Sequence, residues 1–129
     1  MGHIKIFHID DDQDDIDFFI AAIAYISDEK SCFSFTNASK APQKLVSGEL
    51  IPDVIFLDLN MPVINGQEFL STLKSTAGLQ DIPVIILSTA SDSLLVHKLK
   101  GKGASGFLIK PASIKDLSNL LRPYLILIV

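Results

Sequence analysis

Short apolar runs alternate with amphipathic segments along the whole chain. The clearest run is Val54–Leu57, which is directly followed by a carboxylate, Asp58, and then by a loop rich in turn residues. An apolar run of this length between polar residues is typical of a strand that is buried on both faces of a parallel sheet. We therefore predict a strand over Asp53–Leu57, with Asp58 at its C-terminal end.

The same pattern predicts four more strands, at Ile4–Ile9, Cys32–Thr36, Val84–Leu87 and Gly106–Ile109. Apolar residues at helical spacing predict helices between them, at about Asp12–Ser27, Ser39–Ser47, Gly66–Thr76, Leu94–Gly101 and Ser113–Tyr124. We expect Ser113 to be the N-cap of the last helix and Pro123 to kink or end it. Strands that alternate with helices indicate an α/β fold with a parallel sheet and right-handed crossovers. For so short a chain we predict a doubly wound, five-stranded, flavodoxin-like (βα)5 fold with strand order 2-1-3-4-5.

Composition fits this interpretation. The 129 residues suit a single domain over 1–129, with its core at about 4–124. Hydrophobic residues make up 48% and charged residues 20%, and the net charge of −4 disfavours a direct nucleic-acid partner. A single cysteine, Cys32, excludes an internal disulfide and fits a reducing compartment. No apolar run approaches the length of a membrane span, and the short apolar tail Tyr124–Val129 is expected to pack on the sheet or to form a dimer contact.

Polar side chains stand at the ends of four predicted strands: Asp10 and Asp11, Asp58, Ser88, and Lys110. The carboxyl ends of parallel strands meet at one edge of a sheet, where open α/β sheets place their sites. At about 5 Å and an effective dielectric constant of about 20, each pair of like charges there costs roughly 3 kcal/mol before screening. These carboxylates therefore need a positive partner.

A hard divalent cation such as Mg²⁺ meets this need, because it prefers oxygen ligands, and Lys110 adds a further positive charge. A carboxylate can also act as a nucleophile and form an acyl phosphate. The strand ends therefore predict a metal-assisted phosphoryl acceptor at Asp58. The simpler alternative is that Asp58 only caps the following helix or turn.

The combination of Asp10-Asp11, Asp58, Met61-Pro62, Gly66, Ser88 and Lys110-Pro111 resembles the receiver domain of two-component response regulators (CheY-like). The resemblance extends over about Ile4–Tyr124. It implies a stand-alone, cytoplasmic phosphoacceptor module that takes a phosphoryl group from a phosphohistidine on a sensor histidine kinase or histidine phosphotransfer protein. It also implies signalling to a downstream protein target, no enzymatic activity beyond slow autodephosphorylation, no membrane partner, and a monomer or weak homodimer.

The resemblance further implies a ligand set for Mg²⁺. Asp11 and Asp58 would be direct ligands, and Asp10 would act mostly through water. The backbone carbonyl of Asn60 would be a third protein ligand.

Other positions match the residues that change conformation on phosphorylation in this family. The hydroxyl of Ser88 would move toward the phosphoryl group, and Lys110 would pair with one of its oxygens. Thr89 is an alternative to Ser88, but the spacing from the start of the strand and strand alternation favour Ser88. Phe107 matches the switch aromatic residue, and the Lys110–Pro111 bond is expected to be cis. Helix Leu94–Gly101, strand Gly106–Ile109 and the last helix would form the face that partners read.

Three other functions are open to a chain of this topology. An aspartate-nucleophile phosphatase would need an acid or base two residues after Asp58, where this chain has Asn60. A flavin-binding module would offer hydroxyls and backbone amides to the flavin phosphate, whereas Asp10-Asp11-Asp12 repels it. A pseudo-receiver would lack part of the residue set that is present here.

Two further features have plain structural interpretations. The acidic residues Asp12, Asp14, Asp15 and Asp17 are expected to be a solvated helix start, where the helix dipole favours negative charge. His8 is expected to be a residue of the core or the sheet face and not a metal ligand.

Overall fold

The computed structural model describes residues 4–10, 12–26, 30–35, 51–58, 66–75, 80–88 and 93–126. The strands are β1 (Ile4–Ile9), β2 (Lys30–Phe35), β3 (Val54–Asp58), β4 (Val84–Ser88) and β5 (Gly106–Ile109). The helices are α1 (Gln13–Ala24), α3 (Gly66–Ser75), α4 (Ser93–Gly101) and α5 (Ile114–Ile126). The predicted helix Ser39–Ser47 lies outside the described residues.

The strands pair in parallel in the order β2-β1-β3-β4-β5. The chain is therefore an α/β protein with a parallel sheet, as the alternation of elements predicts. In the register between β1 and β3, Ile9 lies opposite Leu57, so the carboxyl ends of these two strands are level. This register determines where the residues that follow each strand are placed.

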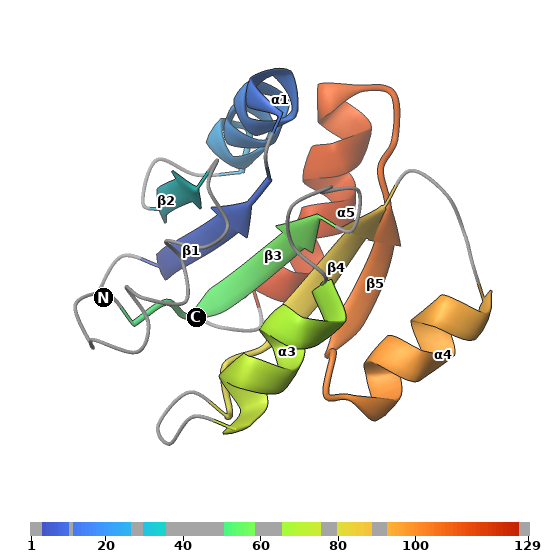
Figure 1. Cartoon of the computed structure of the whole chain (residues 1–129). Helices are drawn as coiled ribbons and strands as arrows, with labels where there is room; N and C mark the ends of the chain where they lie inside the picture. Colours follow the sequence, from blue (N-terminus) through green and yellow to red (C-terminus); the bar gives the residue numbers. More distant parts are fainter. Residues whose placement is uncertain are drawn as a thin grey trace.

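Helices cover the sheet from both sides, with α1 and α5 on one face and α3 and α4 on the other (Figure 1). Successive residues of β3 alternate between these two layers. Val54 and Phe56 pack with α1 and α5, whereas Ile55 and Leu57 pack with α3 and α4. All four side chains are fully buried, which explains why this strand reads as a continuous apolar run.

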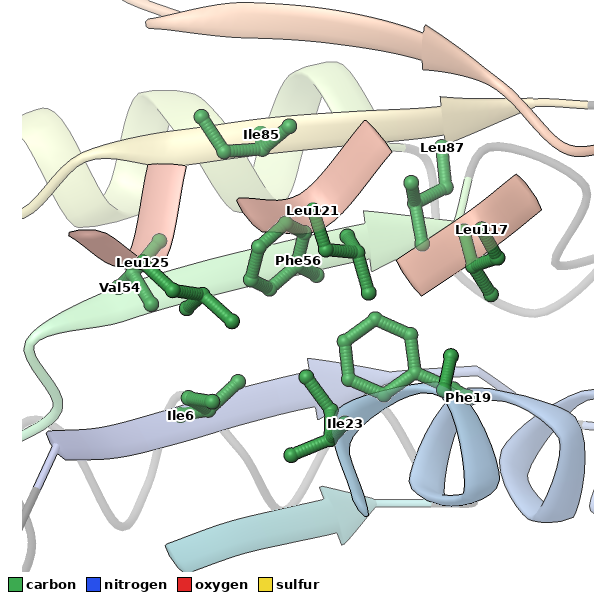
Figure 2. Close-up of a cluster of buried hydrophobic side chains, with 11 residues drawn as sticks. Ile6, Phe19, Ile23, Val54, Phe56, Ile85, Leu87, Leu117, Leu121 and Leu125 are labelled. Carbon is green, nitrogen blue, oxygen red and sulfur yellow. The ribbon is translucent and has the colours of Figure 1, made fainter. Parts of the chain in front are cut away.

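Figure 2 shows the layer between the sheet and helices α1 and α5. Phe19 and Ile23 of α1 meet Leu117 and Leu121 of α5 above the strands. Leu125, from the apolar tail of the sequence, is also fully buried in this layer, so this part of the tail packs on the sheet. The layer fixes the start of α1 and the start of α5 at the same edge of the sheet.

The last helix begins as expected, and of the two effects expected of Pro123, a kink or an end, the structure excludes the end. Ser113 is its N-cap, because its Oγ accepts a hydrogen bond from the backbone N–H of Asp116 at 3.0 Å. Pro123 does not end the helix, which continues to Ile126. Pro123 and Asn119, one turn earlier, are both exposed, so the carbonyl that loses its helical partner lies on the solvent side. None of the described helices is both long and apolar enough to cross a bilayer.

Candidate functional site

Two buried carboxylates lie at adjacent strand ends. Asp58 is the last residue of β3, and Asp10 directly follows β1. The side chain of Asp10 is 0% exposed and that of Asp58 is 2% exposed. Since burial of an unpaired charge is costly, both side chains need a nearby cation or proton.

Lys110 supplies a cation to this pair. It follows β5, and its backbone N–H donates to the carbonyl of Ser88 at 2.8 Å, which continues the pairing with β4. Its Nζ lies 3.3 Å from Oδ2 of Asp58 and 3.4 Å from Oδ2 of Asp10. Asp10, Asp58 and Lys110 thus meet at one edge of the sheet although they come from three strands.

A third carboxylate, that of Asp15 in the first turn of α1, completes this cluster. Its Oδ2 lies 3.1 Å from Lys110 Nζ, the shortest of the three distances to that ammonium. The expectation of a solvated helix start therefore holds only in part: Asp15 lies in the first turn of α1 and is 42% exposed, but it also pairs with Lys110. A sequence signal was available, because Asp15 lies one helical turn before the inward-facing Phe19 and so on the buried side of α1.

The loop between β1 and α1 orients Asp10. Its Oδ1 accepts a hydrogen bond from the backbone N–H of Asp12 at 3.0 Å. Asp12 is in turn the N-cap of α1, and its side chain accepts from the backbone N–H of Asp14 at 2.9 Å. Asp10 is therefore held by the backbone on one oxygen and faces Lys110 with the other.

The protonation of Asp10 and Lys110 reflects this crowding. Burial, together with the neighbouring Asp58, raises the pKa of Asp10 to about 7, against the opposing effects of the Asp12 N–H and Lys110. For Lys110, burial opposes the charged form, but Asp58, Asp10 and Asp15 outweigh it and raise its pKa. The site therefore favours the charged form of Lys110, whereas it disfavours the ionised form of Asp10.

His8 lies on β1, two residues before Asp10. Its ring is 1% exposed and stacks on Phe19, with centroids 4.0 Å apart. Burial and the positive charge of Lys110 lower the pKa of His8 to about 3, so the ring is neutral, and its Nε2 lies 3.7 Å from Asp10 Oδ2. His8 is a buried residue of the sheet, as expected, and it does not add positive charge to the site.

Three members of the cluster, Asp10, Asp15 and Lys110, line a small cavity of about 20 Å³, the size of a single water molecule. Its lining residues are His8, Asp10, Asp15, Phe18, Phe19, Leu87, Lys110 and Leu117.

The donor set fits a hard divalent cation. One carboxylate oxygen from each of Asp10, Asp15 and Asp58 lies within 4.8 Å of the others. Oxygen donors of this kind suit Mg²⁺, and a divalent cation would favour the ionised form of Asp10, which burial and the neighbouring Asp58 disfavour. Two of the predicted metal-binding residues, Asp11 and Asn60, lie outside the described residues.

The remaining predicted site residues lie on β4 and β5 and directly after β5. Ser88 is buried at the end of β4, one strand beyond Asp58. Phe107 is half-buried on β5 and packs against the layer under α3 and α4. The expected cis bond before Pro111 is wrong: the described residues contain no cis peptide bond, so the Lys110–Pro111 bond is trans. The trans form is the intrinsically preferred one for a bond before proline, and here it is compatible with the Lys110–Ser88 backbone pairing.

Comparison with known proteins assigns the chain to a family. The sequence model of a protein family, the response regulator receiver domain, matches residues 6–122. The chain belongs to this family, whose members are receiver domains of two-component signalling and bind Mg²⁺ at an acidic pocket.

Solved structures of similar proteins agree with this assignment. The phosphorylated cyanobacterial phytochrome response regulator RcpA is 25% identical, with a TM-score of 0.82 over 95% of this chain and 91% of that one. A two-component response regulator from Legionella pneumophila is 27% identical, with a TM-score of 0.82 over 95% of this chain and 97% of that one.

Curated relatives are longer than this chain. The transcriptional regulatory protein LnrK of Bacillus subtilis is 36% identical over 111 residues, which are 85% of this chain and 48% of that protein. The probable methanogenesis regulatory protein FilR2 of Methanothrix harundinacea is 28% identical over 101 residues, which are 78% of this chain and 62% of that protein. The chain thus spans about half to two thirds of the length of these relatives.

Proposed function

We propose that Asp58 accepts a phosphoryl group from a phosphohistidine of a partner protein, in a Mg²⁺-dependent step of a two-component phosphorelay. The observation that carries this proposal is the position of Asp58: a carboxylate 2% exposed at a strand end, with an ammonium 3.3 Å away and a second buried carboxylate beside it. The partner is a sensor histidine kinase or a histidine phosphotransfer protein.

In the proposed reaction a carboxylate oxygen of Asp58 attacks the phosphorus atom. The new P–O bond forms as the P–N bond of phosphohistidine breaks, and the imidazole nitrogen leaves with the bond's electron pair and takes up a proton from solvent. Asp10, Asp11, Asp58 and the carbonyl of Asn60 would hold Mg²⁺, which would supply charge neutralisation for the phosphoryl oxygens.

The residues around Asp58 then stabilise the product. Lys110 stands within reach of any group attached to Asp58, so its ammonium pairs with a phosphoryl oxygen. The hydroxyl of Ser88 donates a second contact, and Phe107 repacks as Ser88 moves. Acyl phosphate hydrolysis in this site is slow autodephosphorylation, and the chain does not act as an enzyme on other substrates.

The output face of the proposed switch is formed by α4, β5 and α5. It carries three exposed large apolar residues: Leu94 is 83% exposed, Ile109 is 48% exposed and Leu120 is 38% exposed. A downstream protein target reads this face. We also propose that residues 1–129 form one (βα)5 domain, with its core at about 4–124.

Mass spectrometry after incubation with a small phosphodonor such as acetyl phosphate tests the proposal. We expect one phosphoryl group on Asp58 in the presence of Mg²⁺ and none with a chelator. Asp58→Asn should abolish labelling, whereas Asp81→Asn, at an exposed carboxylate away from the site, should not. Full labelling of Asp58→Asn would place the acceptor elsewhere, and turnover of many phosphate esters per chain would favour a phosphatase.

A further inference from the structure

The ammonium of Lys110 is fully engaged in this structure. A lysine has three N–H donors, and Nζ of Lys110 lies 3.1 Å, 3.3 Å and 3.4 Å from carboxylate oxygens of Asp15, Asp58 and Asp10. Phosphorylation of Asp58 would turn its carboxylate into an acyl phosphate, whose phosphoryl oxygens would compete for this ammonium with the carboxylates of Asp10 and Asp15.

Asp15 reaches Lys110 because the helix start does not need its carboxylate. In many helices the acidic side chain at this position folds back to the N–H of the N-cap residue. Here Asp10 already accepts the N–H of Asp12, at 3.0 Å. The carboxylate of Asp15 can therefore extend across the cavity to the residue after β5.

Of Asp10 and Asp15, the two carboxylates that remain after phosphorylation, Asp15 can be released from Lys110 at less cost. Its side chain is 42% exposed, whereas those of Asp10 and Asp58 are 0% and 2% exposed. Once released, it regains water, which a buried carboxylate cannot do.

We propose that Asp15 is a positioning residue of the phosphoacceptor site, which holds Lys110 in the unphosphorylated protein and competes with the phosphoryl group for the Lys110 ammonium. Asp15 keeps Lys110 aimed at the strand ends, and it weakens the phosphorylated state by the free energy needed to break the Asp15–Lys110 pair. The competition with the phosphoryl group rests on the proposed function, whereas the contact that holds Lys110 in the unphosphorylated protein does not.

The first test needs no phosphoryl group. Amine acylation of the chain, followed by peptide mass spectrometry, gives the reaction rate of Lys110 relative to the exposed Lys5 and Lys98. Asp15→Asn should raise the relative rate at Lys110 about threefold, the effect expected when a partly exposed ion pair is lost. Asp14→Asn removes the same charge from the same exposed helical turn and should leave the rate unchanged. An equal rate in wild type and Asp15→Asn would overturn the proposal.

The second test measures the competition. Beryllium trifluoride, a stable mimic of the phosphoryl group, is titrated in saturating Mg²⁺ into wild type, Asp15→Asn, Lys110→Met and the double variant. Asp15→Asn should tighten binding about threefold when Lys110 is present and by less than about 1.5-fold in the Lys110→Met background, because Asp15 acts through Lys110. The same gain in both backgrounds would instead show direct repulsion between Asp15 and the anion, and would overturn the proposal.

The two tests distinguish a failure of the proposed function from a failure of the role proposed for Asp15. If wild type does not bind the mimic and Asp58 is not labelled, the proposed function fails, while the acylation rates still decide whether Asp15 holds Lys110. If wild type binds the mimic but acylation at Lys110 does not respond to Asp15→Asn, only the role of Asp15 fails. Circular dichroism of each variant verifies that α1 is intact, since Asp15 lies in its first turn.

Discussion

Lys110 Nζ lies 3.3 Å from the carboxylate of Asp58, across β4, which separates their strands in the sheet. The Lys110 side chain is 14% exposed and that of Asp58 is 2% exposed, so water screens this pair only weakly. The pair brings the end of β5 to the candidate phosphoacceptor, and it also compensates the negative charge buried there.

Removal of this ammonium should destabilise the protein in a pH-dependent way. In a chelator at pH 8, Lys110→Met should lower the free energy of unfolding by about 3 kcal/mol, because Asp10 and Asp58 lose their counter-charge. At pH 6 the loss should be smaller, because the pKa of Asp10 is about 7 and its protonation relieves the repulsion. Urea unfolding at the two pH values measures the difference.

An exposed lysine provides the control for this prediction. Lys102→Met, in the turn after α4, should change the free energy of unfolding by less than about 0.5 kcal/mol at either pH. Equal losses for Lys110→Met at pH 6 and pH 8 would contradict the view that charge compensation, and not packing, is the role of Lys110.

Mg²⁺ should stabilise the folded chain through the same carboxylates. A ligand that binds only the folded state adds about 2.7 kcal/mol at one hundred times its dissociation constant. The thermal midpoint of wild type should therefore rise with Mg²⁺ concentration, whereas Asp10→Asn and Asp58→Asn should show little rise. Asp81→Asn should respond as wild type does, and retention of the full Mg²⁺ effect in Asp58→Asn would exclude that residue as a ligand.

Much of the fold follows from local patterns in the sequence. The run Val54–Leu57 is apolar at every position because helices cover both faces of the sheet, and each of these side chains is fully buried. The strand ends then place Asp10, Asp58 and Lys110 at one edge, since parallel strands all end there. The sequence pattern alone therefore predicts that these three residues are neighbours.

The contact between Asp15 and Lys110 could not be derived in the same way. It joins residues 95 positions apart and depends on how α1 packs in the layer where Phe19 and Leu117 are buried together. Helical spacing places Asp15 on the side of Phe19, but it does not say which cation lies opposite. The isomer of the Lys110–Pro111 bond was also beyond the sequence, because the two forms differ intrinsically by only about 0.5–1 kcal/mol.

Gly106, at the start of β5, should not tolerate a larger side chain. An added Cβ would lie 2.9 Å from the hydroxyl of Tyr124 and 3.2 Å from Cδ1 of Ile85. Gly106→Ala should therefore lower the free energy of unfolding by about 1–3 kcal/mol, as measured by urea titration. Tyr124→Phe in the same chain should restore part of the loss, because it removes the nearest atom.

A second glycine shows whether this loss is specific to the crowded position. Gly101, at the end of α4, has no atom within 4 Å of an added Cβ. Gly101→Ala should be neutral or stabilising by up to about 1 kcal/mol. A loss at Gly101 as large as that at Gly106 would mean that backbone flexibility, and not the contact with Tyr124, sets the cost.

His8 and Asp10 should have opposite effects on the pH dependence of stability. Burial lowers the pKa of His8 from 6.5 to about 3, so between these values the unfolded chain binds a proton that the folded chain does not. This makes stability rise with pH, by up to about 1.4 kcal/mol per pH unit. The pKa of Asp10 is raised from 3.8 to about 7, so between these values the folded chain binds the extra proton and stability falls as pH rises.

In the wild type without metal the two effects should largely cancel between about pH 4 and pH 6.5, and single variants should separate them. His8→Phe keeps an aromatic ring against Phe19 and leaves Asp10 alone, so its free energy of unfolding should fall as pH rises from 5 to 7. Asp10→Asn leaves His8 alone, so its stability should rise up to about pH 6.5.

Urea unfolding in chelator across this range measures both slopes, and His97→Asn, on the exposed side of α4, should keep the wild-type profile. If His8→Phe and Asp10→Asn had slopes of the same sign, the opposed protonation of these two buried neighbours would be disproved.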